Sequence, residues 1–228
     1  MCTPRPPRAA ALLAAAALAS ARPPAARAQT LTFEGISTFA GGATAPVGDY
    51  YAGGAGPDYG VTFSPDAFAV CLNTALRACS GSSRGGRGDP ASQGAALTFH
   101  GGAQSFVERA AGFKTALSFA YAAAEGPATV RVWEGAGGTG ALLATLLLPR
   151  TPTGPEPCYG ALYCPFVPAT VTFAGTARSA TFVAGADELA LDDVTFGPAA
   201  PGPVVPEPAP WALVAAGLAA LAAAARRR

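Results

Sequence analysis

Carboxylates are the side chains in this sequence that could act as general acids and bases. A pair of Asp or Glu residues flanking a scissile bond can hydrolyse a glycosidic linkage, and Glu108, Glu125 and Glu134 are available. Nothing in their spacing singles out a pair. His100 is the only histidine, and no nucleophile-elbow sequence accompanies it. The sequence therefore predicts no catalytic residue, and the alternative is a secreted glycoside hydrolase or another carbohydrate-active enzyme.

Four cysteines form two close pairs along the sequence. Cys71 and Cys79 are eight residues apart, and Cys158 and Cys164 are six apart. An even set at short spacing is typical of local disulfides in an oxidising compartment, although four cysteines permit more than one connectivity. A zinc site is the alternative, but the spacings are wider than those of Cys-x-x-Cys ligands. We predict the bonds Cys71–Cys79 and Cys158–Cys164.

Three tyrosines crowd one glycine-rich segment together with two aspartates. They are Tyr50, Tyr51 and Tyr59, next to Asp49 and Asp58. Exposed aromatic rings stack on sugars, and carboxylates hydrogen-bond to sugar hydroxyls. The segment is therefore a candidate sugar-binding loop, with the alternative that the tyrosines only cover a strand.

Short apolar runs separated by glycine and proline fill the middle of the chain, which has 28 Gly and 22 Pro in 228 residues. We predict nine strands, of which the first four alternate apolar with small or polar residues and the others are rich in the residues that strands favour: 31–36, 59–64, 96–100, 113–121, 128–134, 141–148, 166–174, 178–184 and 188–196. The glycine-rich stretch 135–140 between two of these runs predicts a hairpin. Because a sheet must bury its apolar face against another layer, we expect an all-β, two-sheet sandwich of jelly-roll or Greek-key type over residues 29–198.

The N-terminus carries the features of a secretory signal peptide. A basic segment precedes an apolar run over residues 9–19, and Ala26 and Ala28 are the small residues that a signal peptidase site requires. The apolar run is too short to remain in a membrane as an anchor. We therefore expect a signal peptide over residues 1–28, removed by signal peptidase to leave a mature start at Gln29.

The C-terminal tail combines a Pro-Glu-Pro motif, a short apolar run and a terminal arginine cluster. Motif and cluster consist of Pro206, Glu207, Pro208, Arg226, Arg227 and Arg228. The run over 211–225 would form a helix of about 22 Å, which is marginal for a hydrocarbon core of about 30 Å. The arginines would stay in the cytoplasm by the positive-inside rule. We expect a Pro-rich stalk over residues 199–210 and a transmembrane helix with its arginines over 211–228.

This order of motif, helix and arginines resembles the PEP-CTERM sorting signals of bacterial exported proteins. In that family a membrane protease-transpeptidase called an exosortase cuts near the Pro-Glu-Pro and releases or transfers the protein. The resemblance implies an exosortase as partner and a transient stay of the precursor in the inner membrane. It also implies a final location at the cell surface or outside the cell.

The first and last strands expected in the body resemble strands that recur in PEP-CTERM proteins. The matching pieces are LTFEGI at 31–36 and LDDVTFG at 191–197. In related jelly-roll carbohydrate-binding modules these strands lie side by side, which here implies that Glu34 lies near Asp192 and Asp193. Clustered carboxylate oxygens are the ligands that calcium prefers. We expect a calcium site, with the alternative that these carboxylates are solvated charges at strand ends.

The charge of the exported body excludes one class of partner. Residues 29–205 contain 13 acidic and eight basic side chains, a formal charge of −5, so they lack the basic surface that nucleic acid requires. Together with the resemblance, this predicts a non-catalytic exported surface or matrix protein, structural or carbohydrate-binding, that is linked to exopolysaccharide or biofilm. Calcium is the one cofactor that the sequence suggests.

Overall fold

The computed structural model describes residues 29–37, 44–72, 94–101, 105–123, 125–151, 158 and 161–197. Several predicted features lie outside these ranges: the signal peptide, the stalk and the C-terminal helix, with Cys79, Ala26, Ala28, Pro206, Glu207, Pro208, Arg226, Arg227 and Arg228. Within the described ranges, no helix has both the length and the apolar character needed to cross a membrane.

Ten β-strands and one short 3-10 helix make up the described part of the chain. The strands are β1 (Thr30–Leu31), β2 (Thr44–Pro46), β3 (Val61–Phe63), β4 (Ala67–Cys71), β5 (Ala95–Phe99), β6 (Ser105–Ala122), β7 (Ala128–Trp133), β8 (Leu142–Leu148), β9 (Val167–Val183) and β10 (Ala190–Phe196). The 3-10 helix η1 (Ala136–Gly138) lies in the connection between β7 and β8, where the sequence predicts a hairpin. All strand pairs are antiparallel, so the prediction of an all-β domain is confirmed.

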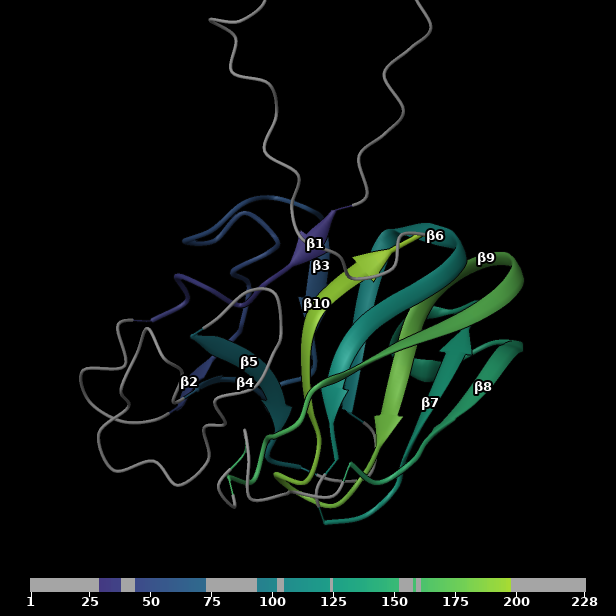
Figure 1. Ribbon diagram of the computed structural model, residues 1–228. Coiled ribbons are helices and arrows are strands. Elements are labelled where there is room, and N and C mark those ends of the chain that lie inside the picture. The colour runs from purple at the N-terminus through teal and green to yellow at the C-terminus, as the bar shows by residue number, and fades with distance from the viewer. Residues whose placement is uncertain are drawn as a thin grey trace, which may run out of the picture.

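The strands hydrogen-bond in the order β2-β4-β5-β10-β6-β9-β7-β8, with β1 beside β10 and β3 beside β6 (Figure 1). The first and last strands are neighbours, because Thr30 pairs with Thr195 and Leu31 with Val194. This confirms the adjacency of the two end strands that the resemblance implied.

Two long strands, β6 and β9, join two halves of this sheet. β6 pairs with β3 near its start, at 107–109, and with β10 near its end, at 117–122. Between these stretches the β6–β9 ladder shifts register twice, and Gly112 and Thr115 have φ of 76° and 73°. Such irregularities bend strands, and Figure 1 shows β6 and β9 curving strongly. We call β2, β4, β5, β10 and the adjoining part of β6 the β10 half, and β3, β7, β8 and the adjoining parts of β6 and β9 the β7 half.

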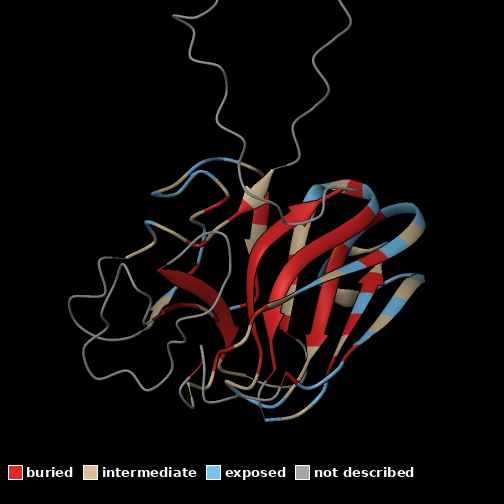
Figure 2. Cartoon of the chain, viewed as in Figure 1, coloured by how far each residue is buried: buried red, intermediate tan, exposed pale blue. Residues whose placement is uncertain are grey.

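One apolar core lies between the two halves. Leu97 and Leu191 of the β10 half and Val130 and Phe182 of the β7 half all belong to it. The rings of Phe99 on β5 and Phe182 on β9 stack at 5.4 Å between centroids. Figure 2 shows the buried residues concentrated along the central strands. The halves therefore pack face to face, which is the arrangement of a β-sandwich.

A second apolar cluster lies on the outer side of the β10 half. Its strand members alternate with residues of the main core: Val70, Leu72, Ala96, Ala120, Ala122 and Ala190. Successive residues of a strand point to opposite faces, so these side chains point away from the core. Tyr163 and Phe166, from the segment before β9, pack onto them, and Tyr163 is fully buried. We call this surface, with the segment over it, the covered face.

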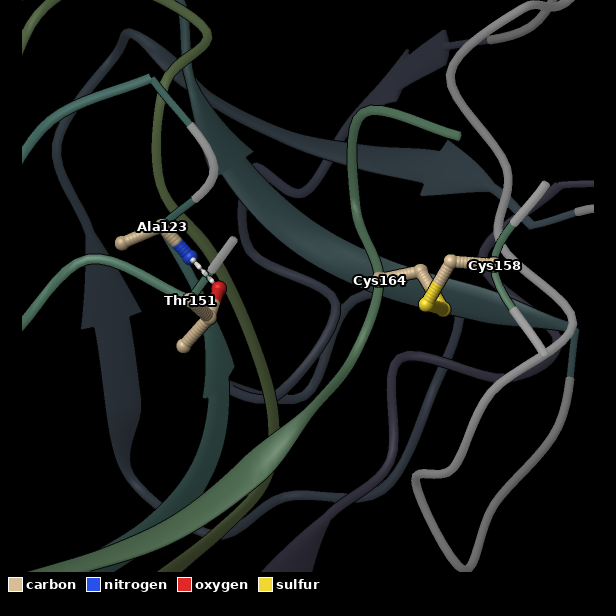
Figure 3. The surroundings of a disulfide bond; sticks show 4 residues. All are labelled: Ala123, Thr151, Cys158 and Cys164. Atoms are coloured by element: carbon tan, nitrogen blue, oxygen red, sulfur yellow. Dashed lines mark hydrogen bonds between the residues drawn. A yellow bond between two sulfur atoms is a disulfide. The ribbon is translucent and has the colours of Figure 1, made fainter. Parts of the chain in front are cut away.

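A disulfide bond closes the segment that covers this face. Cys158 and Cys164 are bonded, with 5.3 Å between their Cα atoms (Figure 3), which confirms that predicted pair. The N–H of Ala123 donates to Thr151 Oγ1 at 2.8 Å and so ties the chain just before this segment to the end of β6. Cys71 is also disulfide-bonded, and its partner lies outside the described residues.

The structure differs from the predicted strands in several places. β1 ends at Leu31 and β6 begins at Ser105, where we predicted strands over 31–36 and 113–121. β9 is one strand over Val167–Val183, where we predicted two, because Gly175 adopts φ of 93° and bends the strand without ending it. β4 was not predicted, since four of its five residues are buried and the alternation of a half-buried strand is absent. β2 was also missed, because three residues that include Pro46 give no strand signal.

Candidate ligand-binding face

The outer side of the β7 half carries polar and aromatic side chains from four strands. In one row across the sheet Phe106 lies opposite Thr181, Thr181 opposite Arg131, and Arg131 opposite Thr145. In the next row Glu108, Ser179, Trp133 and Leu142 follow one another in the same way, and Leu147 lies opposite Thr129. Arg131, Leu142, Thr145 and Leu147 are exposed, while Phe106 and Trp133 are half-buried. We call this set the open face.

Trp133 is the largest side chain on the open face, and its ring is held in place. Its indole N–H donates to Thr181 Oγ1 on the neighbouring strand at 2.9 Å. This bond lays the ring across β9, which explains why Thr181 is only 7% exposed although its strand position faces outward. Part of the indole surface thus stays available, because Trp133 is only half-buried, while its orientation is fixed, which is the property that a stacking platform needs.

The connection between β7 and β8 folds back onto the open face and borders it. Glu108 accepts the N–H of Gly137 at 3.0 Å, and Ser179 accepts the N–H of Gly138 at 3.0 Å. Ser179 also donates to the carbonyl of Gly135 at 2.6 Å. A Cβ at Gly138 would approach Thr181 Cγ2 to 2.5 Å, so only glycine fits there. The turn therefore forms a fixed wall beside Trp133.

The groups that remain available on the open face suit a polyhydroxylated ligand. Arg131 is exposed and offers several N–H donors. Thr145, next to it on β8, is also exposed and offers a hydroxyl. Aromatic surface beside a few hydrogen-bonding groups is the usual composition of small-molecule sites. The face can stack one ring and hydrogen-bond to groups around it.

The three tyrosines of the predicted site lie together, but Tyr51, which contacts the other two rings, points into the protein. The ring of Tyr51 lies 5.0 Å from that of Tyr50 and 6.0 Å from that of Tyr59, yet Tyr51 is only 3% exposed and belongs to the main core. Burial raises the pKa of the Tyr51 phenol, and the hydrogen bond from the N–H of Phe33 partly offsets this. The prediction that all three tyrosines bind sugar is therefore wrong for Tyr51, whose ring packs inward because it anchors β1 to the core.

The predicted calcium ligands lie in or next to the paired strands β1 and β10, but Glu34 and Asp192 each accept a hydrogen bond from a backbone N–H. Asp192 is fully buried and accepts the N–H of Asp193 at 2.7 Å, in a bulge where Asp193 has φ of 50°. Glu34 accepts the N–H of Ala95 at 3.0 Å. Among the described residues no group of three or more His, Cys, Asp or Glu side chains could hold a metal ion. The structure therefore does not bring Glu34, Asp192 and Asp193 together as a calcium site.

Two of the carboxylates considered for hydrolysis, Glu125 and Glu134, lie at opposite ends of one strand. Glu125 precedes β7 and Glu134 follows it, so the length of the strand, about 20 Å at roughly 3.3 Å per residue, separates them. Glu108 accepts hydrogen bonds at both oxygens, from Thr62 Oγ1 and from Gly137. His100 pairs with the carboxylate of Asp187. Glu108 and His100 therefore support a turn and a loop.

Comparison with known proteins gives no family for the chain. Neither the scan of family models nor the search of curated proteins finds a match. Among solved structures, the K2 cleaved adhesin domain of Lys-gingipain has a TM-score of 0.40 and 15% identity, over 77% of this chain and 100% of that one. A module from Paenibacillus barcinonensis of carbohydrate-binding family 35 gives 0.33 and 15%, over 69% and 100%. A carbohydrate-binding module of Cellvibrio mixtus lichenase 5A, in complex with cellotriose, gives 0.31 and 14%, over 46% and 79%. The similarity is distant, and no residue is transferred from these proteins.

Sequence reasoning missed the open face, although a signal for it was present. The run 128–134 alternates, so Thr129, Arg131 and Trp133 share one face opposite the apolar Val130 and Val132. A tryptophan on the polar side of a half-buried strand is unusual enough to mark a binding surface. The contributions of Phe106 and Thr181 could not be seen, because they depend on how β6 and β9 pair.

Proposed function

We propose that this chain is an exported, non-catalytic surface or matrix protein whose body binds polysaccharide through the open face. One observation carries the proposal: the outer side of the β10 half is sealed by its own disulfide-closed segment, whereas that of the β7 half presents Trp133 and Arg131. We assign the body to the jelly-roll class of sandwiches.

Trp133 and its neighbours have distinct roles in this proposal. The indole stacks on the apolar face of a pyranose ring, in the orientation that its bond to Thr181 sets. Arg131 and Thr145 hydrogen-bond to hydroxyl or carboxylate groups of the sugar beside it. Because the ring and the turn next to it are already fixed, little conformational entropy is lost on binding.

The export route in the proposal rests on the two ends of the chain. Signal peptidase cuts after Ala28, and an exosortase cuts near Pro206–Pro208, so the mature protein leaves the inner membrane for the cell surface or the extracellular polysaccharide layer. The Cys158–Cys164 bond agrees with an oxidising compartment. The intact mass of the exported protein tests this route, and a mass that includes residues 211–228 would contradict it.

Affinity electrophoresis of the exported protein, in gels with the producer's own extracellular polysaccharide, tests the binding function. Trp133→Ala is expected to abolish the retardation, and Arg131→Ala to weaken it. Tyr59→Ala is the matched control, because it removes a half-buried aromatic ring elsewhere and should leave retardation intact. Loss in the control but not in Trp133→Ala would place the site at the tyrosines. Release of reducing ends from the polysaccharide would contradict the non-catalytic assignment.

A further inference from the structure

Strand β8 is a long edge of the sheet, and within the described residues it has none of the usual protection. In the described chain it pairs only with β7. The opposite edge, β2, has three residues and contains Pro46, and short edges and prolines both prevent pairing with other chains. β8 has seven residues, LLATLLL, with no charge, proline or glycine. Such an edge is a template for another strand.

The same strand carries exposed leucines. Leu142 is 50% exposed and Leu147 is 63% exposed, and they are the exposed large hydrophobic residues of the described chain. A register shift at the start of β8 sets Leu142 opposite Trp133, while Leu143 packs against the core. The free energy of these apolar side chains is lower when they are buried against another copy than when they are in contact with water.

The charges at the two ends of β8 indicate which strand fits it. Glu134 is exposed and lies at the start of β8, because its N–H donates to the carbonyl of Ala141 at 3.0 Å. Arg150 is exposed and lies two residues beyond the end. In an antiparallel pair of two β8 strands, the start of each lies beside the end of the other. Glu134 of one copy and Arg150 of the second copy then come to the same end of the joined sheet, on either side of the start of β8, and this occurs twice in a symmetric pair.

We propose that two copies of this chain associate through β8, pairing it antiparallel with itself to form one continuous sheet. The two-fold axis of such a pair is perpendicular to the sheet, so both open faces point to the same side. The dimer does not depend on the proposed sugar binding. If both hold, the two faces engage one polysaccharide strand together, and the avidity exceeds the affinity of a single face.

Sedimentation equilibrium of the exported protein without ligand tests this proposal. A monomer–dimer equilibrium is expected. Glu134→Arg alone and Arg150→Glu alone should each weaken it by about tenfold, because each replaces two attractive pairs by two repulsive ones. The double variant Glu134→Arg/Arg150→Glu should restore it, which only pairing with the same chain explains. Leu147→Lys should also weaken the dimer, whereas Thr44→Lys on the opposite edge should not.

Two results would overturn the proposal. One is a monomer at every concentration up to about 1 mM, well above the range of specific dimers. The other is association that the single charge reversals leave unchanged, or that the double variant fails to restore, which would assign it to another surface or to a retained C-terminal helix. Circular dichroism of each variant separates these results from misfolding. Because this experiment contains no polysaccharide, neither result bears on the proposed binding function, which affinity electrophoresis tests separately.

Discussion

The two outer faces of this protein are built from similar antiparallel strands, but one face is covered by another segment of the chain and the other is open. On the β10 half, four alanines, Val70 and Leu72 face outward, and a segment carrying Tyr163 and closed by Cys158–Cys164 buries them as a second core. On the β7 half, the outward side chains are larger and more polar, and only the η1 turn packs against them. The small outward residues of the β10 half leave room for a segment to pack over them. On the β7 half, Trp133 and Arg131 instead present an indole ring and a guanidinium group.

This difference separates stability from function in the molecule. The covered face gains apolar burial on both sides of its strands, which adds to the free energy of unfolding. The open face forgoes part of that burial and keeps an aromatic ring and a guanidinium accessible. Substitutions on the covered face should therefore change stability strongly, and those on the open face should change binding with a small effect on stability.

The largest effect is expected from Tyr163→Ala. Tyr163 is fully buried, its hydroxyl donates to the carbonyl of Asp187 at 2.7 Å, and it also lies 3.0 Å from Thr98 Oγ1. Removing the ring leaves a cavity in the second core and should lower the free energy of unfolding by about 3–5 kcal/mol. Urea denaturation measures this. A loss below about 1 kcal/mol would mean that the segment contributes little to the covered face.

Opening the disulfide should have the next largest effect. The double variant Cys158→Ser/Cys164→Ser releases a loop of six residues, and the chain-entropy relation gives a loss of about 2 kcal/mol. The midpoint of urea denaturation, recorded without reductant so that the bond at Cys71 stays intact, is the measurement. Combined with Tyr163→Ala, the loss should be less than additive, because both act on one segment. Full additivity would show that the disulfide bond and Tyr163 contribute to the free energy of unfolding independently.

A smaller effect is expected at the contact between the two halves. Asp66 precedes β4, and Ser105 at the start of β6 donates to its Oδ2 at 2.5 Å. Burial raises the pKa of Asp66, but hydrogen bonds from the side chains of Ser105 and Ser64 outweigh it, so the pKa lies below its ordinary value. A depressed carboxyl pKa stabilises the fold above the unfolded pKa, and this contribution is lost as the pH falls through the folded value.

The Asp66→Asn variant tests this contact. Its melting temperature should fall less than that of the unaltered protein between about pH 6 and pH 2, because the asparagine has no proton to gain in the range where carboxylates titrate. Ser105→Ala should shift the pKa of Asp66 upward, which NMR titration of the carboxyl can follow. Parallel acid curves for both proteins would show that this contact does not link the halves.

The smallest change in stability is expected from Trp133→Ala. The ring is half-buried and makes one hydrogen bond to Thr181, so its removal should lower the free energy of unfolding by about 1 kcal/mol. Equilibrium denaturation beside Tyr163→Ala makes the comparison direct. If the two losses were equal, the open face would be as structural as the covered one.

Local patterns could be read from the sequence, and long-range ones could not. The 135–140 hairpin and the Cys158–Cys164 bond depend on residues close in the chain, and both are present. The pairing of β1 with β10 followed from a resemblance and is also confirmed. Tyr51 was misread because its neighbours suggested an exposed loop, whereas long-range packing against Phe33 and Phe63 buries it.

The two faces themselves were beyond sequence reasoning for a physical reason. Whether an outward residue is covered depends on where a distant segment of the chain folds. The sequence around Ala96 and Ala190 does not predict that Tyr163 packs on them. The places where β6 and β9 change register likewise depend on how the two strands pair with each other. Contacts between residues far apart in sequence decide both features.

Fluorescence of Trp133 tests the central claim most directly. The sequence has two tryptophans, and Trp211 lies in the predicted tail, so Trp211→Phe leaves Trp133 as the reporter even if the tail is retained. Titration with the producer's polysaccharide should give a saturable change in emission and protect the indole from acrylamide quenching. The account is contradicted if the polysaccharide binds while both the emission and the quenching of Trp133 stay unchanged.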